Sequence, residues 1–214
     1  MQIIETNVFT LDELDDSAKE RARQWWRDAM DSSDYADHVI EDAGQVAELF
    51  GIEFKKHPVK LMGGSTRQDP CVWWSGFSSQ GDGASFEGWF KPRGGNFARL
   101  CEYAPQDAVL KEIAIDLDRI WSLSEGFPVS CRITTSGGYS HSNTMDFELS
   151  ADDDVSEEAF GKLEDAIPPV LRRFADWIYR QLEAEYEYQS SDEQVDETLM
   201  SNEYTFTAEG KRYG

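Results

Sequence analysis

Basic residues are scarce in this chain of 214 residues. Only 20 Lys and Arg stand against 42 Asp and Glu, which gives a formal net charge of −22 at pH 7. Contacts to phosphate groups depend on Lys and Arg, so this balance argues against unaided binding to nucleic acid or to an anionic membrane. Solubility of a small domain needs a net charge of only about 2 to 8. The excess negative charge therefore needs an explanation beyond solubility.

Cysteine and long apolar runs are also scarce. The three cysteines, Cys71, Cys101 and Cys131, are odd in number and form no CxxC pair. A disulfide framework is therefore not expected, and a reducing cytoplasm is the simpler interpretation. The sequence contains no run of about 18 apolar residues, which predicts no membrane-spanning segment. The first 16 residues lack the basic and apolar regions of a signal peptide.

The sequence also lacks the motifs that mark catalysis or cofactor binding. It contains no GxxxxGK[ST] phosphate loop, no GxSxG nucleophile elbow, no HExxH pair and no EF-hand pattern. His38, Glu41 and Asp42 lie within one expected helical turn, but a single histidine is too few for a convincing zinc site. We therefore expect no metal, no cofactor and no enzymatic activity.

Aromatic residues are abundant, at 13% of the chain with seven Trp, which is typical of a folded protein. A capping box beginning at Thr10 predicts the start of a first helix. Further helices are expected over 33–50, over 106–123 and from Ser156 onward, with Pro168 and Pro169 ending one helix and starting another. Strands are expected over 2–9, 52–62, 71–77, 84–90, 127–135 and 144–149, and residues 63–70 are expected to form a loop.

This order of elements predicts a single α+β domain over residues 1–214. We expect an antiparallel sheet of four to five strands, built from two hairpins, packed against several helices. The N- and C-terminal regions are helical. Residues 1–50 carry a net charge of −9 and residues 151–214 carry −11, whereas the sheet-rich residues 51–150 carry only −2.

Several acidic residues are expected to stack on helix faces without compensating bases. They follow each other at intervals of four, in the sets Asp12, Asp16 and Glu20; Glu183 and Glu187; and Glu193 and Glu197. Each like-charge pair at this spacing costs roughly 0.2 to 0.5 kcal/mol. One interpretation is a solvated helix surface. The other is an acidic face that docks on a basic protein surface, such as one built for nucleic acid, so that the chain acts as a DNA mimic.

Two glycine-containing turns are the most site-like segments. The first, SSQGDG, brings together Ser78, Ser79, Gln80 and Asp82, and the second, GGYSHS, contains His141. Asp-Gly between two strands is first of all a hairpin turn. Asp82 and His141 could form a hydrolytic pair if the two turns meet, but a histidine in a surface turn is the simpler interpretation.

Five segments of the chain resemble a known family. They are LMGGSTRQDP (61–70), SGFSSQGDGASFEG (75–88), EYAPQD (102–107), DWIYRQLEAEYEY (176–188) and SNEYTFTAEGKR (201–212). These segments resemble acidic proteins encoded by bacteriophages and prophages, which are often labelled as the antitoxin of a toxin–antitoxin stability system. The resemblance implies a phage origin, the bacterial host cytoplasm as location and a role in phage conflict, and it assigns no catalytic residue.

The leading hypothesis is a non-enzymatic, phage-encoded inhibitor or antitoxin-like protein. Its acidic helices would bind and neutralise a host or phage protein with a basic surface, such as a defence, toxin or nucleic-acid-handling protein, without direct contact to nucleic acid or membrane. The alternative hypothesis is a protein that binds or hydrolyses a small ligand, such as a nucleotide, through the two turns.

Overall fold

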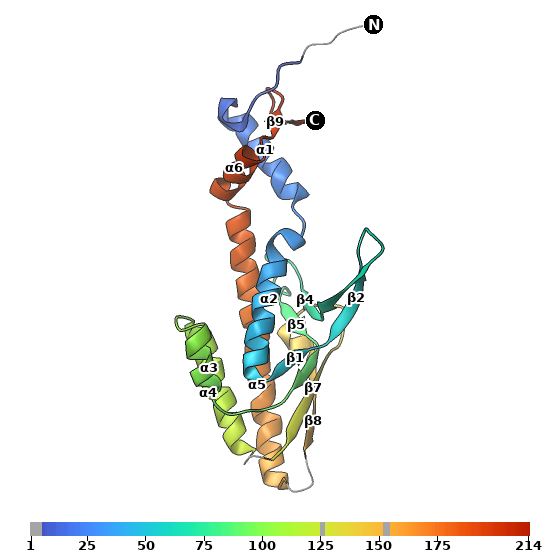
Figure 1. The fold of residues 1–214 in the computed structure, drawn as a ribbon, viewed down its shortest axis with the longest axis vertical. Coiled ribbons are helices and arrows are strands. Elements are labelled where there is room, and N and C mark those ends of the chain that lie inside the picture. Colours follow the sequence, from blue (N-terminus) through green and yellow to red (C-terminus); the bar gives the residue numbers. More distant parts are fainter. Residues whose placement is uncertain (1–5, 125–126, 152–154) are drawn as a thin grey trace. The chain divides into compact units, whose positions relative to one another are not determined.

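The computed structural model describes residues 6–124, 127–151 and 155–214, and it has the expected α+β fold (Figure 1). The helices are α1 (Asp16–Ala29), α2 (Ser33–Phe50), α3 (Asn96–Tyr103), α4 (Ala108–Leu123), α5 (Glu157–Gln189) and α6 (Asp192–Ser201), with short 3₁₀ turns η1 (Leu11–Glu13) and η2 (Ser142–Thr144). The strands are β1 (Ile52–Phe54), β2 (Lys56–Lys60), β3 (Thr66–Pro70), β4 (Val72–Trp74), β5 (Ala84–Phe86), β6 (Gly88–Phe90), β7 (Val129–Thr135), β8 (Met145–Ala151), β9 (Thr205–Phe206) and β10 (Arg212–Tyr213). None of the helices in these parts of the chain has the length and apolar character that a membrane crossing requires.

The chain divides into two compact units. The terminal unit combines residues 1–37 with residues 182–214, and the central unit comprises residues 38–181. The boundary falls within α2 and within α5. Because each unit has its own internal contacts, each is described by itself.

The central unit contains a four-stranded antiparallel sheet in the order β1-β6-β7-β8. Two-stranded pairs, β2 with β3 and β4 with β5, complete its strands. Both expected hairpins are confirmed, as β4–β5 and β7–β8. The expected strand over 84–90 is divided at Glu87, because β5 pairs with β4 whereas β6 pairs with β1 and β7.

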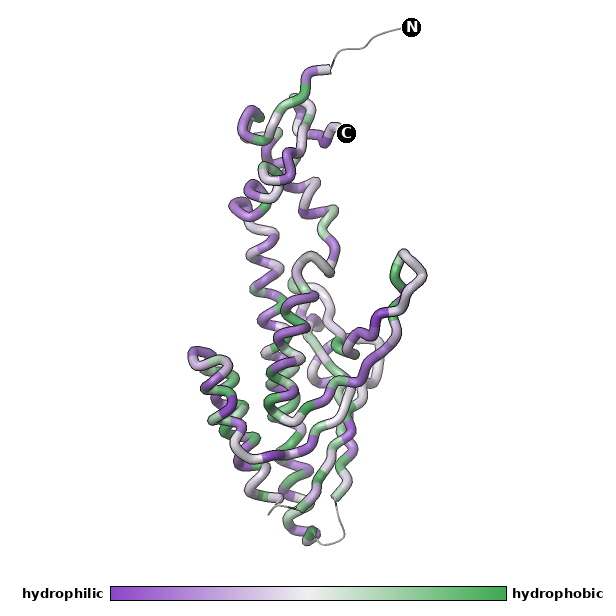
Figure 2. Tube along the Cα trace, in the orientation of Figure 1, coloured by the Kyte–Doolittle hydropathy of each residue, from purple (hydrophilic) through white to green (hydrophobic). Residues whose placement is uncertain are grey.

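The core of the central unit is built around α5. Phe174 of α5 is fully buried, with its ring centroid 5.9 Å from Phe50 of α2, 6.4 Å from Phe54 of β1 and 5.9 Å from Phe86 of β5. Figure 2 shows hydrophobic residues concentrated where α2, α5 and the strands adjoin. A second set of contacts joins α5 to α4, since the Trp177 indole donates to Asp107, the N-cap of α4, at 2.8 Å. One face of α5 therefore connects the strands to α2 and to the start of α4.

The two prolines of α5 do not end a helix, so the expectation of two helices at this point is wrong. Pro168 and Pro169 lie inside a continuous α5. Their missing N–H groups would have reached the carbonyls of residues 164 and 165. Both of those residues are exposed, so water can satisfy the freed carbonyls. The stripe on either side of the prolines, Leu163, Ile167, Val170 and Leu171, is buried and holds the helix in place.

The start of the first helix also differs from the expectation. The capping box of Thr10 and Glu13 is present, with the Thr10 N–H donating to Glu13 at 2.9 Å, but it closes only the 3₁₀ turn η1. Helix α1 begins at Asp16, where the Asp15 carboxylate accepts the N–H of Ala18 at 2.8 Å. Leu14 separates the two elements in an extended conformation. As a result Asp12 lies outside α1.

Helix α3 was not expected, because its N-terminal cap comes from elsewhere in the sequence. The Asp118 carboxylate of α4 accepts the N–H groups of Asn96 at 2.8 Å and Phe97 at 3.1 Å. These bonds satisfy two donors that a helix leaves free at its start. The capping residue lies 22 positions after the helix begins, so no local pattern predicts it.

Strand β3 lies in the segment expected to be a loop, over residues 63–70. It pairs with β2 in a two-stranded hairpin, and neither strand buries a residue fully. Without a buried face there is no apolar alternation to reveal a strand. Pro58 lies in β2, where a two-stranded pair leaves an open edge that tolerates its missing N–H.

The terminal unit has a smaller apolar core. Its buried members are Leu11, Leu14, Ala18, Ala22, Val195, Leu199 and Phe206, with Phe9, Trp25, Trp26 and Tyr204 packed against them. Phe9 forms a β-bridge with Phe206, while residues 2–5 of the expected first strand lie outside the described residues. The Ser191 hydroxyl caps the short helix α6 by accepting the N–H of Gln194.

We expect Phe174→Ala to lower the free energy of unfolding by roughly 3 to 5 kcal/mol, because it leaves a cavity at the point where α2, β1 and β5 meet. Urea denaturation followed by circular dichroism measures the change. Phe97→Ala is the matched control, because Phe97 of α3 is 40% exposed and its loss should cost much less. Equal losses in the two variants would contradict the central place of Phe174.

Candidate functional site

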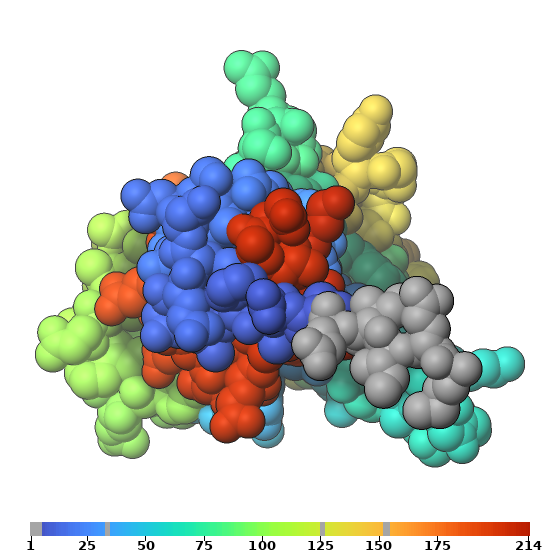
Figure 3. Space-filling view, turned by 90° about the horizontal axis from the view of Figure 1, so that it is seen from above, coloured from blue at the N-terminus to red at the C-terminus, as the bar shows by residue number. Residues whose placement is uncertain are grey.

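The negative charge is concentrated in the terminal unit. Its 70 residues include 19 acidic and 6 basic residues, a net charge of −13, against −9 for the 144 residues of the central unit. Figure 3 shows that the N-terminal segment, in blue, and the C-terminal segment, in red, lie directly against each other. One third of the chain therefore carries more than half of the excess charge, from segments far apart in the sequence.

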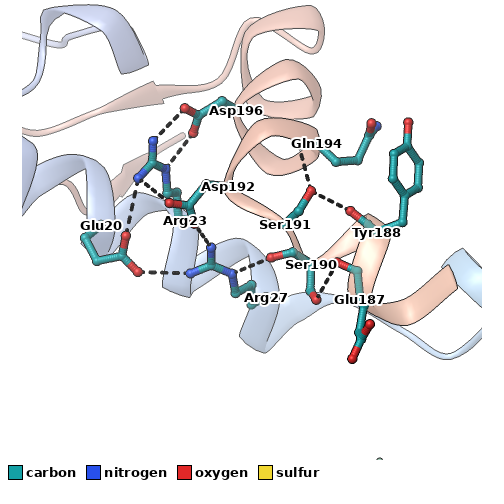
Figure 4. Close-up of polar contacts among 10 residues, drawn as sticks. All are labelled: Glu20, Arg23, Arg27, Glu187, Tyr188, Ser190, Ser191, Asp192, Gln194 and Asp196. Carbon is teal, nitrogen blue, oxygen red and sulfur yellow. Dashed lines mark hydrogen bonds and ion pairs between the residues drawn. The ribbon is translucent and has the colours of Figure 1, made fainter. Parts of the chain in front are cut away.

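Arg23 of α1 is the centre of an ion-pair network in this unit (Figure 4). Its Nε and Nη2 donate to the two carboxylate oxygens of Asp196 in α6, each at 2.7 Å. Its Nη1 also lies 3.1 Å from Asp192 and 3.4 Å from Glu20. The hydrogen bonds to Asp196 raise the pKa of Arg23. Three carboxylates therefore bind the guanidinium. The pair with Asp196 is bidentate, a geometry that Arg can form and Lys cannot.

Arg27, one helical turn later, extends the network. Its Nη1 lies 3.0 Å from Glu20, its Nη2 donates to Asp192, and its Nε donates to the Ser190 carbonyl at 2.9 Å. Both arginine side chains are about 20% exposed. Together they attach α1 to the start of α6.

The acids predicted to form the docking surface lie on four different elements. Asp12 is in η1, where it accepts the Thr10 hydroxyl at 2.6 Å, and this bond lowers its pKa. Asp16 and Glu20 are in α1, Glu183 and Glu187 are in α5, and Glu193 and Glu197 are in α6. The expectation that Asp12 shares a helix face with Asp16 and Glu20 is wrong, because α1 begins only at Asp16. The expectation that Glu20 lacks a compensating base is also wrong, because it pairs with Arg23 and Arg27.

Helix α6 has two acidic faces with different roles. Asp192 and Asp196 face α1 and its arginines, on the same side as the buried Val195. Glu193 and Glu197 are exposed, and neither forms an ion pair with any residue in the described parts of the chain. The charge on the first face is neutralised within the unit, and the charge on the second is left for solvent or a partner.

Apart from Glu20, the network residues were not among the predicted site residues, although the sequence contains a signal for them. Arg23 and Arg27 are four residues apart in one helix, and Asp192 and Asp196 are four apart in another. Each pair therefore presents two like charges on one helix face, with opposite sign in the two helices. Only the folded structure brings the two faces together, because 165 residues separate Arg27 from Asp192.

The SSQGDG turn is held by its own carboxylate. Asp82 accepts the backbone N–H groups of Ser78 at 3.0 Å and Ser79 at 2.7 Å, and these bonds lower its pKa. The carboxylate therefore closes the turn in the way that Asp commonly does. Gln80, at the tip of the turn, is exposed.

The two predicted ligand turns do lie against each other, but Asp82 and His141 form hydrogen bonds to backbone N–H groups of their own turns. A Cβ added at Gly83 would lie 2.9 Å from Cδ2 of His141, so the imidazole lies directly over the first turn. The Nδ1 of His141 accepts the Asn143 N–H at 3.0 Å as the cap of η2. Among the described residues no hydrogen bond joins Asp82 to His141. Both groups are occupied with backbone bonds, which favours the structural interpretation of the two turns.

An open cavity of about 350 Å³ lies beside these turns, within the central unit. Its lining comprises Trp73, Ser85, Glu87, Thr135, Gly137, Gly138, Tyr139 and Ser140. Within the described chain, none of the five predicted ligand residues lines this cavity. The second turn contributes to it through its glycines and Tyr139 rather than through His141.

The cysteines have the character of structural residues. Cys71 is 2% exposed with its Sγ 3.6 Å from Nδ1 of His57, yet burial raises the pKa of this thiol. Burial also raises the pKa of Cys131 to about 12. A nucleophilic cysteine needs a lowered pKa, so neither fits that role. In the described part of the chain, no group of three or more His, Cys, Asp or Glu side chains is placed to hold a metal ion.

Comparison with known proteins gives one match. The model of the family described as "Domain of unknown function (DUF8835)" matches residues 35–192. No curated protein matches, and no solved structure matches.

We expect Arg23→Ala to lower the free energy of unfolding by about 1 to 3 kcal/mol, because it leaves Asp196 without its two charged hydrogen bonds. Chemical denaturation of the single variants and of Arg23→Ala with Asp196→Ala measures the coupling between the two residues. Arg119→Ala is the control: its pair with Asp116 is similarly short, at 2.6 Å, but its side chain is 73% exposed. A coupling near zero for Arg23 and Asp196 would contradict a structural role for the network.

We expect the native protein at pH 8 to react with iodoacetamide at Cys101 alone, because Cys101 is only half-buried while the other two thiols are buried. Mass spectrometry should find one modified cysteine in the native protein and three after unfolding in denaturant. Early modification of Cys71 would instead indicate a reactive thiol beside His57.

Proposed function

We propose that this chain, which belongs to the family described as "Domain of unknown function (DUF8835)", is a non-enzymatic binding protein whose terminal unit docks on a basic surface of a partner protein. The observation that carries the proposal is the division of charge on α6. The arginines of α1 pair with Asp192 and Asp196, while Glu193 and Glu197 are exposed and form no ion pair with those arginines.

The other cations of the terminal unit support this division. Nε of Arg21 donates to the carbonyl of Glu209, and Arg212 lies over the rings of Trp25 and Tyr204 at about 5 Å. Together with Arg23 and Arg27, four of the six basic residues of the terminal unit therefore form contacts with other residues of that unit. A partner that supplies Lys and Arg would neutralise the remaining acids, and complementary fields of this kind speed association and select partners.

Apolar side chains stand next to the exposed acids. Met200 follows Glu193 and Glu197 along the same side of α6 and is 52% exposed, and Tyr188 at the end of α5 is 56% exposed. Binding energy in interfaces comes mainly from such anchors, with the charges giving orientation and rate. The proposed docking surface therefore comprises Glu187, Tyr188, Glu193, Glu197 and Met200.

The resemblance to acidic phage and prophage proteins supports a class of partner. We propose a phage-encoded inhibitor or antitoxin-like factor, acting in the bacterial host cytoplasm on a defence, toxin or nucleic-acid-handling protein. A surface built to bind phosphates is basic, and an acidic helix face can occupy it as nucleic acid would.

We expect Glu193→Lys with Glu197→Lys to weaken partner binding roughly 10-fold or more, because like charges placed opposite each other in an interface cost several kcal/mol. The immobilised chain is first used to capture partners from bacterial lysate, with elution by salt rising to about 1 M, where charges are screened beyond about 3 Å. Titration calorimetry with the purified partner then compares the variants.

Glu102→Lys with Glu112→Lys is the matched control. It changes the net charge by the same amount, at two exposed positions of α3 and α4 in the central unit. Binding should stay within about twofold of the unmodified chain, since the docking surface is untouched. Equal weakening by both variants would show that only net charge matters, and no weakening by either would overturn the proposal.

A further inference from the structure

One side of the cavity in the central unit is formed by Trp73, whose ring packs against His57. Trp73 of β4 is 39% exposed, and the imidazole of His57 packs against it with ring centroids 5.0 Å apart. A second aromatic ring, Tyr139 in the β7–β8 turn, lines the same cavity and is 78% exposed. Exposed aromatic rings on a rigid strand and an adjacent turn provide a surface on which a flat ligand can stack.

The polar side of the cavity is a fixed carboxylate. One oxygen of Glu87 accepts the Thr135 hydroxyl at 2.9 Å, and the other accepts Nζ of Lys55 at 2.6 Å. The bond to Lys55, followed by the bond to Thr135, lowers the pKa of Glu87, so this group is ionised at neutral pH. A carboxylate has about four acceptor positions, and these two bonds use only two of them. One acceptor position on each oxygen of Glu87 is therefore left for a ligand.

These features define the chemistry of the ligand. It must be flat enough to stack on Trp73, and it must present two adjacent donors to the Glu87 carboxylate. The base-pairing edge of guanine carries such donors on N1 and N2, whereas adenine presents an acceptor at N1. A cavity of about 350 Å³ is at the lower end of ligand pockets, which suits a single base with its sugar and phosphate left in solvent.

We propose that this cavity binds the guanine base of a nucleoside or nucleotide, stacked between Trp73 and Tyr139 and read by Glu87. The hydroxyl of Ser85, which is 1% exposed, and the hydroxyl of Ser140 supply further polar contacts around the ring. The site uses none of the residues of the docking surface on α6, so the two proposals stand or fall separately.

Calorimetric titration of the full chain with GMP, IMP and AMP tests the proposal. The three nucleotides carry the same phosphate, so differences between them report on the base alone. We expect GMP to bind roughly 5- to 150-fold more tightly than AMP, which is the discrimination expected from a bidentate hydrogen-bonded contact to one base. IMP, which keeps the N1 donor and lacks the N2 amine, should bind with intermediate affinity.

Two variants separate the roles of carboxylate and ring. Glu87→Gln should bring the GMP and AMP affinities to near equality, because the amide replaces one acceptor with a donor. Tyr139→Ala should weaken all three nucleotides by a similar factor of roughly 5 to 150 through the loss of stacking. Tyr139 is exposed enough for the variant to keep the fold, and Tyr213→Ala, at a 48% exposed position outside both proposed surfaces, is the matched control.

The proposal would be overturned if GMP showed no saturable binding at millimolar concentration, or if AMP bound equally well. It would also be overturned if glucose, which is not a flat base, displaced GMP, or if the preference for GMP survived Glu87→Gln. Glu193→Lys with Glu197→Lys should leave GMP binding unchanged. The same double variant tests partner docking, so failure of one proposal is distinguishable from failure of the other.

Discussion

The packing of Phe174 is the contact on which the central unit depends. Its ring contacts one aromatic residue from α2, one from β1 and one from β5. A single buried side chain therefore connects α2 and α5 to the four-stranded sheet, through β1, and to the β4–β5 pair, through β5. Trp177, one turn further along α5, is stacked on Phe174 and binds the N-cap of α4. The prolines of α5 are tolerated because this stripe continues on both sides of them. The cavity beside Trp73 and Glu87 is in turn placed by β4 and β5, which Phe86 ties to the same core.

In the terminal unit, charge and apolar packing act together. The small core around Phe206 and Val195 brings the two ends of the chain to one place, and the arginine network then joins α1 to α6. This arrangement solves a problem that the composition creates. A net charge of −13 in 70 residues is self-repelling. The pairing of Arg23 and Arg27 with acids of α1 and α6 reduces that cost where the two helices touch.

The cavity and the docking surface differ in how much of each lies within the segment that the family model matches. Every residue lining the cavity lies between positions 35 and 192, where the family model matches, whereas Glu193 and Glu197 lie just beyond it. The cavity is thus built by the part of the chain that the family model describes. The docking surface crosses the end of the match: Glu187 and Tyr188 lie within it, and Glu193, Glu197 and Met200 lie beyond it.

The α+β class, the two hairpins and most helices followed from the sequence, because apolar periodicity and turn residues are local signals. The buried stripe of α2, the cap at Ser191 and the turn closed by Asp82 are examples in which the determining atoms lie within a few residues. Only the tertiary structure decided the features whose partners lie far apart. The cap of α3 is Asp118, two partners of Arg23 are in α6, and the cavity joins Trp73 to a turn more than 60 residues later. The sequence by itself determined that the chain is acidic and where the charge falls along it. Which acids are neutralised within the molecule depended on which helix faces came together, and that is set by burial of apolar side chains rather than by the charges themselves.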